Sequence, residues 1–344
     1  MRAVVIRAHG GLERLELAEV PPPDDPTLAV IEVRAVGINH LDLWVRRGVP
    51  GHEFPLPIIP GSEVSGVIAS VPRGTEGWSV GDEVVVAPGL SCGRCIQCLS
   101  GNDPLCREFG ILGETRDGGC AERIAVPVRN LVRKPAALSF EEAASIPLDF
   151  LTAWHMLVAR ARLRPGESVL VHAGGSGVGS AGIQIAKLWQ ARVLTTVGSS
   201  GKKERAVALG ADEVILYREA DFAAEVRRLT GRRGVDVVLE HVGADTFEGS
   251  MRSLARGGRL VTCGATTGAD VTINLRLVFF KSLSILGSTM GSLAELHELF
   301  AHVEGGRLRP VVDRVLPLEE VAEAHRILEN REAFGKIVLR VGDR

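Results

Sequence analysis

The chain has 344 residues, a formal net charge of -2 and 45% hydrophobic residues. This length predicts about two domains, and the apolar content is sufficient for two cores. The near-neutral charge gives no basic field for nucleic acid, and no segment approaches the run of about 20 apolar residues that a membrane-spanning helix needs. The start, Met1-Arg2-Ala3-Val4, runs straight into a strand-like pattern without a cleavable secretory segment. We therefore expect a soluble globular protein of the cytoplasm.

The first 150 residues have the pattern of a small, irregular β-rich domain. Short β-branched runs at residues 30–36, 64–71 and 83–87 alternate with clusters of proline and glycine. Such clusters interrupt strands and favour turns.

One loop of this region contains four cysteines, Cys92, Cys95, Cys98 and Cys106. The spacing C-x2-C-x2-C-x7-C gathers four thiolates, the donor set of a closed, tetrahedral zinc site. Because protein would fill all four positions, we predict one structural zinc ion per subunit and no chemistry at this metal. Disulfides would need an oxidising compartment, and the common iron–sulfur pattern has a closer fourth cysteine followed by proline.

From residue 167 onward, strands alternate with helical stretches. Strands are expected at residues 168–172, 192–197, 213–216, 235–240, 259–263 and 283–286, with helices at 180–189 and 202–209. This alternation predicts an α/β domain with a parallel sheet and right-handed crossovers. The tail, with helices at 293–303 and 318–329 and a strand at 336–341, is too short to form a domain alone, so we expect it to pack on the first domain.

A glycine-rich turn follows the first of these strands. It reads Ala173-Gly174-Gly175-Ser176-Gly177-Val178-Gly179. Glycine lets backbone amides approach a pyrophosphate, and the next helix offers its N-terminal amides and the positive end of its dipole. Because the turn closes a buried strand and opens an apolar helix, it favours a dinucleotide site over an ordinary turn.

The end of the next strand indicates which dinucleotide binds. An acid there would accept the ribose hydroxyls of NAD, whereas NADP needs donors and cations around its extra phosphate. The strand at 192–197 is followed by Gly198-Ser199-Ser200-Gly201-Lys202-Lys203, with no acid before Glu204. We expect NADP(H) to be preferred over NAD(H), with Ser199, Ser200 and Lys202 at the ribose end. The alternative is that Ser200 only caps a helix with solvated lysines.

These motifs occur with three others, at residues 61–66 (Gly-Ser-Glu-Val-Ser-Gly), 117–122 (Asp-Gly-Gly-Cys-Ala-Glu) and 335–339 (Gly-Lys-Ile-Val-Leu). Together they resemble the medium-chain dehydrogenase/reductase superfamily. The resemblance implies a GroES-like domain (residues 1–149 and 288–344), a Rossmann domain (150–287) and an active site in the cleft. It also implies a homodimer or homotetramer in which two Rossmann sheets join near residues 283–286. By resemblance, the further cofactor-binding residues are Thr152, Val242, Gly243, Cys263, Gly264, Ala265 and Lys336, the last reaching the phosphates.

The sequence departs from the zinc-dependent alcohol dehydrogenases at their catalytic metal. The resemblance places Asn39, Ser62 and Leu148 at the three ligand positions, and none of these side chains is a good zinc ligand. The usual site is therefore expected to be absent. A rearranged metal site is the alternative, and it would use the neighbouring residues His40, Glu63 and Asp149.

Loss of that metal changes which substrates are reasonable. Hydride transfer to a simple ketone leaves negative charge on one oxygen, where a Lewis acid supplies several kcal/mol, whereas a quinone or conjugated carbonyl spreads the charge. Modest donors such as the Asn39 amide and His40 would then suffice, and residues 37–48 and 147–154 resemble the quinone oxidoreductase branch. We predict an NAD(P)H-dependent reductase of such acceptors, with Asn39, His40, Ser62 and Asp149 as catalytic residues. Two alternatives are a zinc-dependent alcohol dehydrogenase with an atypical site and a non-catalytic NADP(H)-binding protein.

Overall fold

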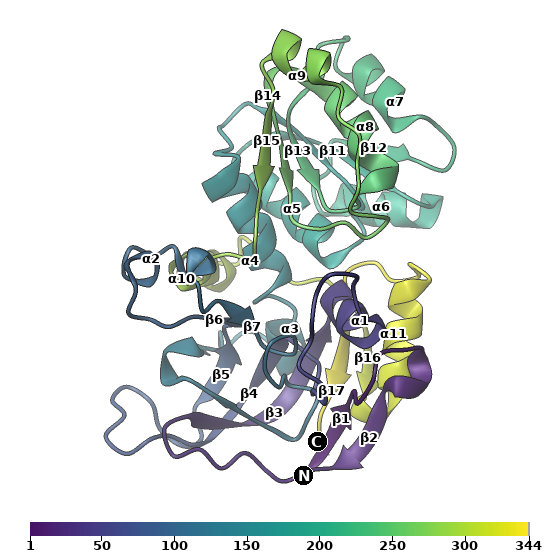
Figure 1. Ribbon diagram of the computed structural model, residues 1–344. Helices are drawn as coiled ribbons and strands as arrows, with labels where there is room; N and C mark the ends of the chain where they lie inside the picture. The colour runs from purple at the N-terminus through teal and green to yellow at the C-terminus, as the bar shows by residue number, and fades with distance from the viewer. Residues whose placement is uncertain (343–344) are drawn as a thin grey trace. The chain divides into compact units, whose positions relative to one another are not determined.

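The computed structural model describes residues 1–342 and divides the chain into two compact units. One unit comprises Met1–Leu148 and the segment from Ser292 onward, and the other comprises Asp149–Gly291. The sequence had placed these boundaries at 149/150 and 287/288. Figure 1 labels most of the helices and strands of both units.

A seven-stranded sheet forms the centre of the first unit, within the described residues. The strand order is β16-β17-β3-β4-β5-β9, and β8 also pairs with β3. The strands are β3 (Ala29–Ile38), β4 (Glu63–Ser70), β5 (Glu83–Val86), β8 (Arg123–Val126), β9 (Leu131–Arg133), β16 (Val312–Pro317) and β17 (Lys336–Arg340). Alternate side chains of these strands are buried in one core, and Ala35 and Val338, which face the other way, pack with Ala144 in a second, smaller cluster.

The C-terminal tail completes this sheet, which confirms that it packs on the first domain. Strand β17 pairs antiparallel with β3, with Ile337 opposite Ile38, and β16 pairs parallel with β17. This register brings Lys336, the first residue of β17, beside Asn39, which directly follows β3, although the two residues are 297 positions apart in the sequence.

The remaining elements of the first unit are short. They are β1 (Arg2–Val5) and β2 (Glu16–Glu19), β6 (Gly89–Leu90) and β7 (Gly110–Ile111), α1 (His40–Arg47), α2 (Ile96–Leu99), α3 (Phe140–Ala143), α10 (Leu293–Glu304) and α11 (Val321–Glu329), with 3-10 turns at Leu12–Arg14, Asp103–Leu105, Val128–Asn130 and Leu318–Glu320. The expected helix at 318–329 is thus a 3-10 turn that leads into α11.

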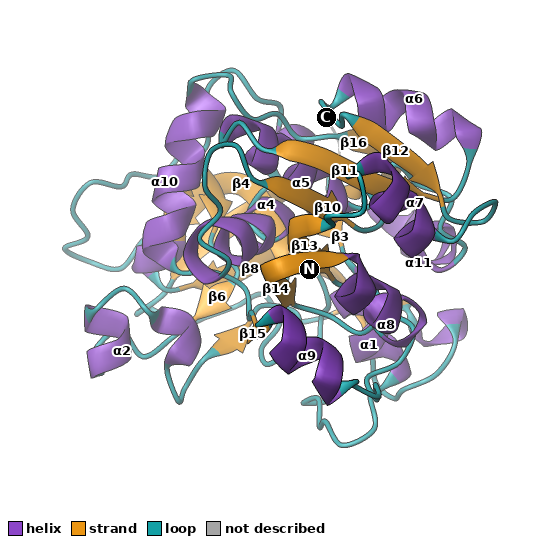
Figure 2. Ribbon diagram, turned by 90° about the horizontal axis from the view of Figure 1, so that it is seen from above, coloured by secondary structure: helices purple, strands orange, loops and turns teal. Residues whose placement is uncertain are grey.

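The second unit contains a six-stranded, all-parallel sheet in the order β12-β11-β10-β13-β14-β15. Its strands are β10 (Ser168–Val171), β11 (Arg192–Val197), β12 (Glu213–Leu216), β13 (Val235–Glu240), β14 (Leu254–Thr262) and β15 (Ser284–Gly287). This is the strand order of a Rossmann fold, in which the chain direction across the sheet reverses beside the first strand, here β10. Figure 2 shows β12, β11 and β10 side by side.

The helices of the second unit connect these strands. They are α4 (Asp149–Trp154), α5 (Gly177–Leu188), α6 (Ser200–Ala208), α7 (Phe222–Leu229), α8 (Ala244–Ser253) and α9 (Leu275–Lys281), with a π-helical turn at His155–Arg160. Strand β14 begins at Leu254, so the sequence-based start at residue 259 was wrong. Leu254 already pairs with Val235, so β14 starts earlier than its regular part. The pairing is irregular after Val235, and the regular register begins where Arg259 pairs with Val237.

No helix within residues 1–342 combines the length and the apolar character that crossing a membrane requires.

Candidate active site

The glycine-rich turn lies between β10 and α5, as predicted. Ser176 caps α5, because its hydroxyl accepts a hydrogen bond from the Gly179 amide at 2.9 Å. A Cβ at Gly174 would overlap the Thr195 side chain, and one at Gly179 would overlap the Ala173 carbonyl. Without side chains at these glycines, a ligand can approach the backbone of the turn at the N-terminus of α5. The backbone amides and the helix dipole there favour a pyrophosphate.

Asp149 lies against this same turn. A Cβ at Gly177 would overlap the Asp149 carboxylate, which is 5% exposed. Thr152, one turn further along α4, is also buried, and its hydroxyl lies 4.0 Å from the sulfur of Met290. The structure thus groups Asp149 with the dinucleotide turn, while the roles assigned to Asp149 and Thr152 stay predictions.

The turn after β11, where the ribose is expected, lies beside two residues that the sequence analysis did not name. Ser199 and Ser200 are exposed after β11, and the Ser199 hydroxyl makes no capping bond to α6. A Cβ built on Gly198 would lie 3.0 Å from the Tyr217 hydroxyl and 3.5 Å from Arg218 Nε. Both side chains follow β12, whose carboxyl end is at the same edge of the sheet as that of β11.

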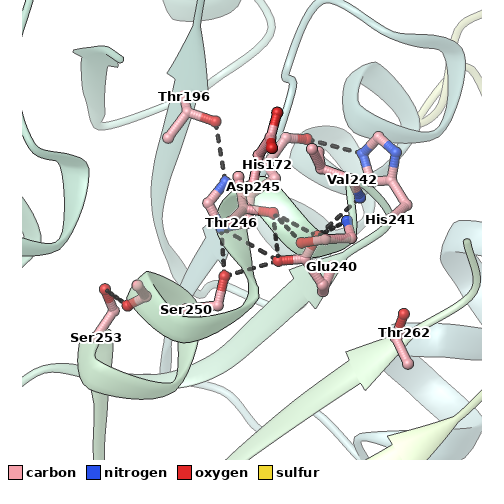
Figure 3. Close-up of polar contacts among 12 residues, drawn as sticks. His172, Thr196, Glu240, His241, Val242, Asp245, Thr246, Ser250, Ser253 and Thr262 are labelled. Carbon is pink, nitrogen blue, oxygen red and sulfur yellow. Dashed lines mark hydrogen bonds and ion pairs between the residues drawn. The ribbon is translucent and has the colours of Figure 1, made fainter. Parts of the chain in front are cut away.

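A buried polar network fixes the loop after β13 (Figure 3). Glu240 Oε1 accepts the backbone amides of Val242 at 2.7 Å and Gly243 at 3.1 Å, and the carboxylate also accepts the hydroxyls of Thr246 and Ser250. Burial raises the pKa of Glu240, but the charge that His172 carries at low pH and these hydrogen bonds outweigh burial and lower the pKa overall. The carboxylate is therefore ionised while it holds Val242 and Gly243 in place.

The loop after β14 joins this arrangement. The Cys263 amide donates to the Glu240 carbonyl, and the Thr262 hydroxyl donates to the Gly264 carbonyl at 3.3 Å. Burial, with the nearby Asp149 and Glu240, raises the pKa of the Cys263 thiol to about 12. Cys263 is thus a neutral thiol beside Gly264 and Ala265, in keeping with a lining rather than a nucleophilic role.

In the first unit, Asn39 and Glu63 meet Lys336 in a buried cluster. Lys336 Nζ donates to Asn39 Oδ1 at 2.5 Å and pairs with the Glu63 carboxylate, and Asn39 Nδ2 donates to Glu63 Oε2 at 3.2 Å. Glu63 also accepts the Leu148 amide at 2.7 Å. The three residues are 5%, 0% and 3% exposed in the order Asn39, Glu63, Lys336. The structure therefore places Lys336 beside Asn39 and Glu63, and its role at the cofactor phosphates stays a prediction.

Two further polar side chains flank this cluster. Asp42 caps α1 by accepting the Asn39 amide at 2.7 Å, and it also accepts the Gly61 amide at 2.8 Å. Burial raises the pKa of Asp42 to about 6, against these hydrogen bonds and the charge of Lys336. Ser62 is fully buried, and its hydroxyl has no hydrogen-bond partner among the described residues. His40, the first residue of α1, is partly exposed.

The four cysteines of the loop meet as predicted. Their sulfur atoms all lie within 4.8 Å of one another, with Cys92–Cys98 at 3.8 Å and Cys95–Cys98 at 3.5 Å. Zn–S bonds of about 2.3 Å in a tetrahedron separate the sulfurs by about 3.8 Å, so this set fits a zinc ion. Within residues 1–342, no other group of three or more metal-binding side chains has this geometry.

Two known protein families match parts of this sequence. An alcohol dehydrogenase GroES-like domain matches residues 25–136, and a zinc-binding dehydrogenase domain matches residues 209–339. These matches indicate the class of protein, a dehydrogenase with a GroES-like domain that is similar to the zinc-binding dehydrogenases.

Individual relatives extend over the full length. The chain is 53% identical to a crystal structure titled NAD-dependent alcohol dehydrogenase, with a TM-score of 0.95 over 99% of this chain and 100% of that one. It is 32% identical to the quinone oxidoreductase of Pongo abelii over 98% of this chain and 97% of the relative. It is 30% identical to a 2-octenoyl-CoA carboxylase reductase solved with NADP and 2-octenoyl-CoA, with a TM-score of 0.92 over 99% of this chain and 87% of that one. The chain belongs to the medium-chain dehydrogenase/reductase superfamily and is an NAD(P)-dependent oxidoreductase.

Proposed function

We propose that the protein reduces a quinone or a conjugated carbonyl with NADPH, without a catalytic zinc ion, and holds one structural zinc ion in its cysteine loop. The observation that carries this proposal is the cluster of Asn39, Glu63 and Lys336. At the positions where the zinc-dependent relatives are expected to hold the metal, this chain has an amide, a hydroxyl and Leu148, and an ammonium group neutralises the Glu63 carboxylate. Such a donor set is poor for zinc.

The residues of each unit have separate parts in this reaction. When bound, the dinucleotide supplies a hydride from its nicotinamide ring. The turn at residues 173–179 binds its pyrophosphate, and the loops at 242–243 and 263–265 hold the nicotinamide end. In the first unit, Lys336 holds the Asn39 amide and the Glu63 carboxylate in one orientation.

The hydrogen bonds of the Asn39 side chain limit the role that we predicted for it. Its Nδ2 donates to the Gly37 carbonyl at 3.3 Å and to Glu63, and its Oδ1 accepts from Lys336. The amide is therefore already committed to protein partners, which leaves it a weaker donor for an acceptor oxygen than a free amide. A substrate that spreads the added charge over its own π system suits such a site better than a simple ketone, which needs a strong electrophile.

NADP(H) is the preferred cofactor in this proposal. The turn after β11 contains Ser199, Ser200 and Lys202 with no acid, and Arg218 adds a second cation beside Gly198. A 2′-phosphate is stabilised by such cations and donors, whereas NAD relatives offer a carboxylate to the ribose.

Replacing Arg218 with alanine tests this preference. We expect the KM for NADPH to rise about tenfold, the equivalent of about 1.4 kcal/mol, with little change in the KM for NADH. Arg192→Ala is the matched control, because Arg192 lies at the opposite end of β11 and pairs with Glu213. Equal losses for both cofactors in Arg218→Ala would contradict the assignment.

A homo-oligomer is also part of the proposal. Strand β15 is an edge of its sheet, and Ile285 on it and Leu275, Phe279 and Phe280 on α9 are exposed. An unpaired edge strand beside exposed apolar side chains favours pairing with a second copy of the chain.

A second candidate function is a zinc-dependent alcohol dehydrogenase. The 53% identity to a structure titled NAD-dependent alcohol dehydrogenase favours it. A non-catalytic binding protein is disfavoured, because the curated relatives are named as oxidoreductases or dehydrogenases.

One experiment separates the two candidates. NADPH and NADH oxidation is followed with 1,4-benzoquinone, a conjugated enone and a simple ketone, and alcohol oxidation with NADP and NAD. We expect turnover with the quinone or enone and little with the ketone or alcohols. Turnover of simple alcohols that a chelator of loosely held zinc abolishes would favour the alcohol dehydrogenase.

A further inference from the structure

A continuous hydrogen-bonded chain runs through the second unit from the dinucleotide turn to the loop after β13 (Figure 3). The Ala173 amide donates to Thr196 Oγ1 at 3.0 Å, and Thr196 Oγ1 lies 3.1 Å from His172 Nδ1. His172 Nε2 lies 2.9 Å from Ser250 Oγ, which donates to Glu240 Oε2 at 2.7 Å. The chain thus connects the ends of β10, β11 and β13 with α8.

The direction of each bond follows from counting protons. Glu240 is an acceptor only, so the single Ser250 hydroxyl proton must lie between Ser250 and Glu240. Ser250 Oγ can then only accept from His172, which requires the proton on His172 Nε2. Because the buried ring is neutral, Nδ1 carries no proton and accepts from the Thr196 hydroxyl. Every bond of the chain therefore points from the Ala173 amide toward Glu240.

Burial supports a neutral ring in this position. His172 is 1% exposed, and burial lowers its pKa to about 4 although the charge of Glu240 opposes the shift. The other titratable group that faces the ring is His241, whose Nε2 lies 2.9 Å from the His172 carbonyl.

The two ends of this hydrogen-bonded chain are the backbone segments that we expect to hold the cofactor. At one end, Ala173 has φ of 46°, a left-handed conformation that a non-glycine residue keeps only when its surroundings fix it. At the other end, Glu240 accepts the amides of Val242 and Gly243. Loss of a hydrogen bond in the middle of this series should therefore alter the conformation of both backbone segments.

We propose that four side chains position the segments that bind the dinucleotide: Thr196, His172, Ser250 and Glu240. Their hydrogen bonds all run in one direction, with the proton of His172 on Nε2. Together they align the turn at residues 173–179 with the loop at residues 242–243. This proposal rests on dinucleotide binding and not on the identity of the acceptor. In this proposal the four side chains act through the geometry of residues 173–179 and 242–243.

Ser250→Ala and Thr196→Val break the chain at two different bonds. Ser253→Ala is the matched control: Ser253 is also buried in α8, but its hydroxyl donates to the Gly249 carbonyl at 2.8 Å and lies outside the chain. Binding of NADPH is measured by fluorescence titration without any acceptor. We expect about tenfold weaker binding in Ser250→Ala and in Thr196→Val, and unchanged binding in Ser253→Ala. Ser250→Thr should restore binding.

Steady-state kinetics separates positioning from stability. In Ser250→Ala the KM for NADPH should rise about tenfold, and kcat at saturating NADPH should change by less than about threefold. Wild-type affinity in both Ser250→Ala and Thr196→Val would overturn the proposal, as would equal losses in Ser253→Ala.

The tautomer of His172 provides a test in the wild-type protein. Nitrogen-15 NMR of the wild-type protein labelled at histidine should show His172 with a protonated Nε2 and an unprotonated Nδ1 at neutral pH, assigned by comparison with His172→Gln. A proton on Nδ1, or on both nitrogens, would contradict the direction of the chain. A failed acceptor panel with intact NADPH binding would leave this proposal standing.

Discussion

Replacing Lys336 with methionine is expected to lower the free energy of unfolding by about 3–5 kcal/mol, because the buried Glu63 carboxylate would lose its ammonium partner. Both side chains are almost fully buried, at 4% and 0% exposure, so solvent cannot replace the lost interaction. The measurement is urea denaturation of the cofactor-free protein.

Two further variants control this result. Lys134→Met removes another lysine with a side chain 4% exposed, but its partner Glu83 is 50% exposed, so Glu83 stays hydrated and the loss should be about 1 kcal/mol. In Lys336→Met/Glu63→Gln no charge is left buried, and part of the stability should return. A loss of less than about 1 kcal/mol in Lys336→Met would show that Lys336 is not the essential partner of Glu63.

Replacing Cys98 with serine is the second large effect that we expect. The variant should lose its zinc, and segment 92–106 should become sensitive to trypsin. The reason is that bound metal stabilises only the folded loop. This stabilisation is about 4 kcal/mol when the free zinc concentration exceeds the Kd 1,000-fold. Arg94 and Arg107 are exposed at the two ends of the loop and provide the cleavage sites.

Cys263→Ser is the matched control for this loop, since Cys263 lies outside it, in the second unit. This variant should keep one zinc per chain and resist cleavage at residues 94 and 107. Cleavage of wild-type protein and Cys98→Ser at equal rates would contradict a structural role of the metal.

The zinc loop and the dinucleotide turn were predictable because each depends on residues close together in the sequence. The spacing of Cys92, Cys95, Cys98 and Cys106 is a local property, and so is the position of Gly174–Gly179 between a strand and a helix. The bounds of β11, β12 and β13 were also predicted correctly, because their apolar runs are interrupted by turn residues.

The remaining site residues depend on sheet register and strand order. Lys336 meets Asn39 only because β17 pairs antiparallel with β3, and the sequence placed it at the cofactor phosphates. Arg218 reaches Gly198 because β12 is the neighbour of β11. The sequence analysis did not find the role of Glu240, because its partners come from the loop after β13, from α8 and from His172 at the end of β10.

The zinc content of the active enzyme tests the central claim most directly. Zinc is measured per chain by mass spectrometry in a preparation whose turnover of NADPH with a quinone or enone is known. We predict one zinc ion per chain in the wild-type protein, none in Cys98→Ser, and retained turnover by Cys98→Ser at a temperature where it is folded. A second zinc ion per chain whose removal abolishes turnover would contradict hydride transfer without a catalytic metal.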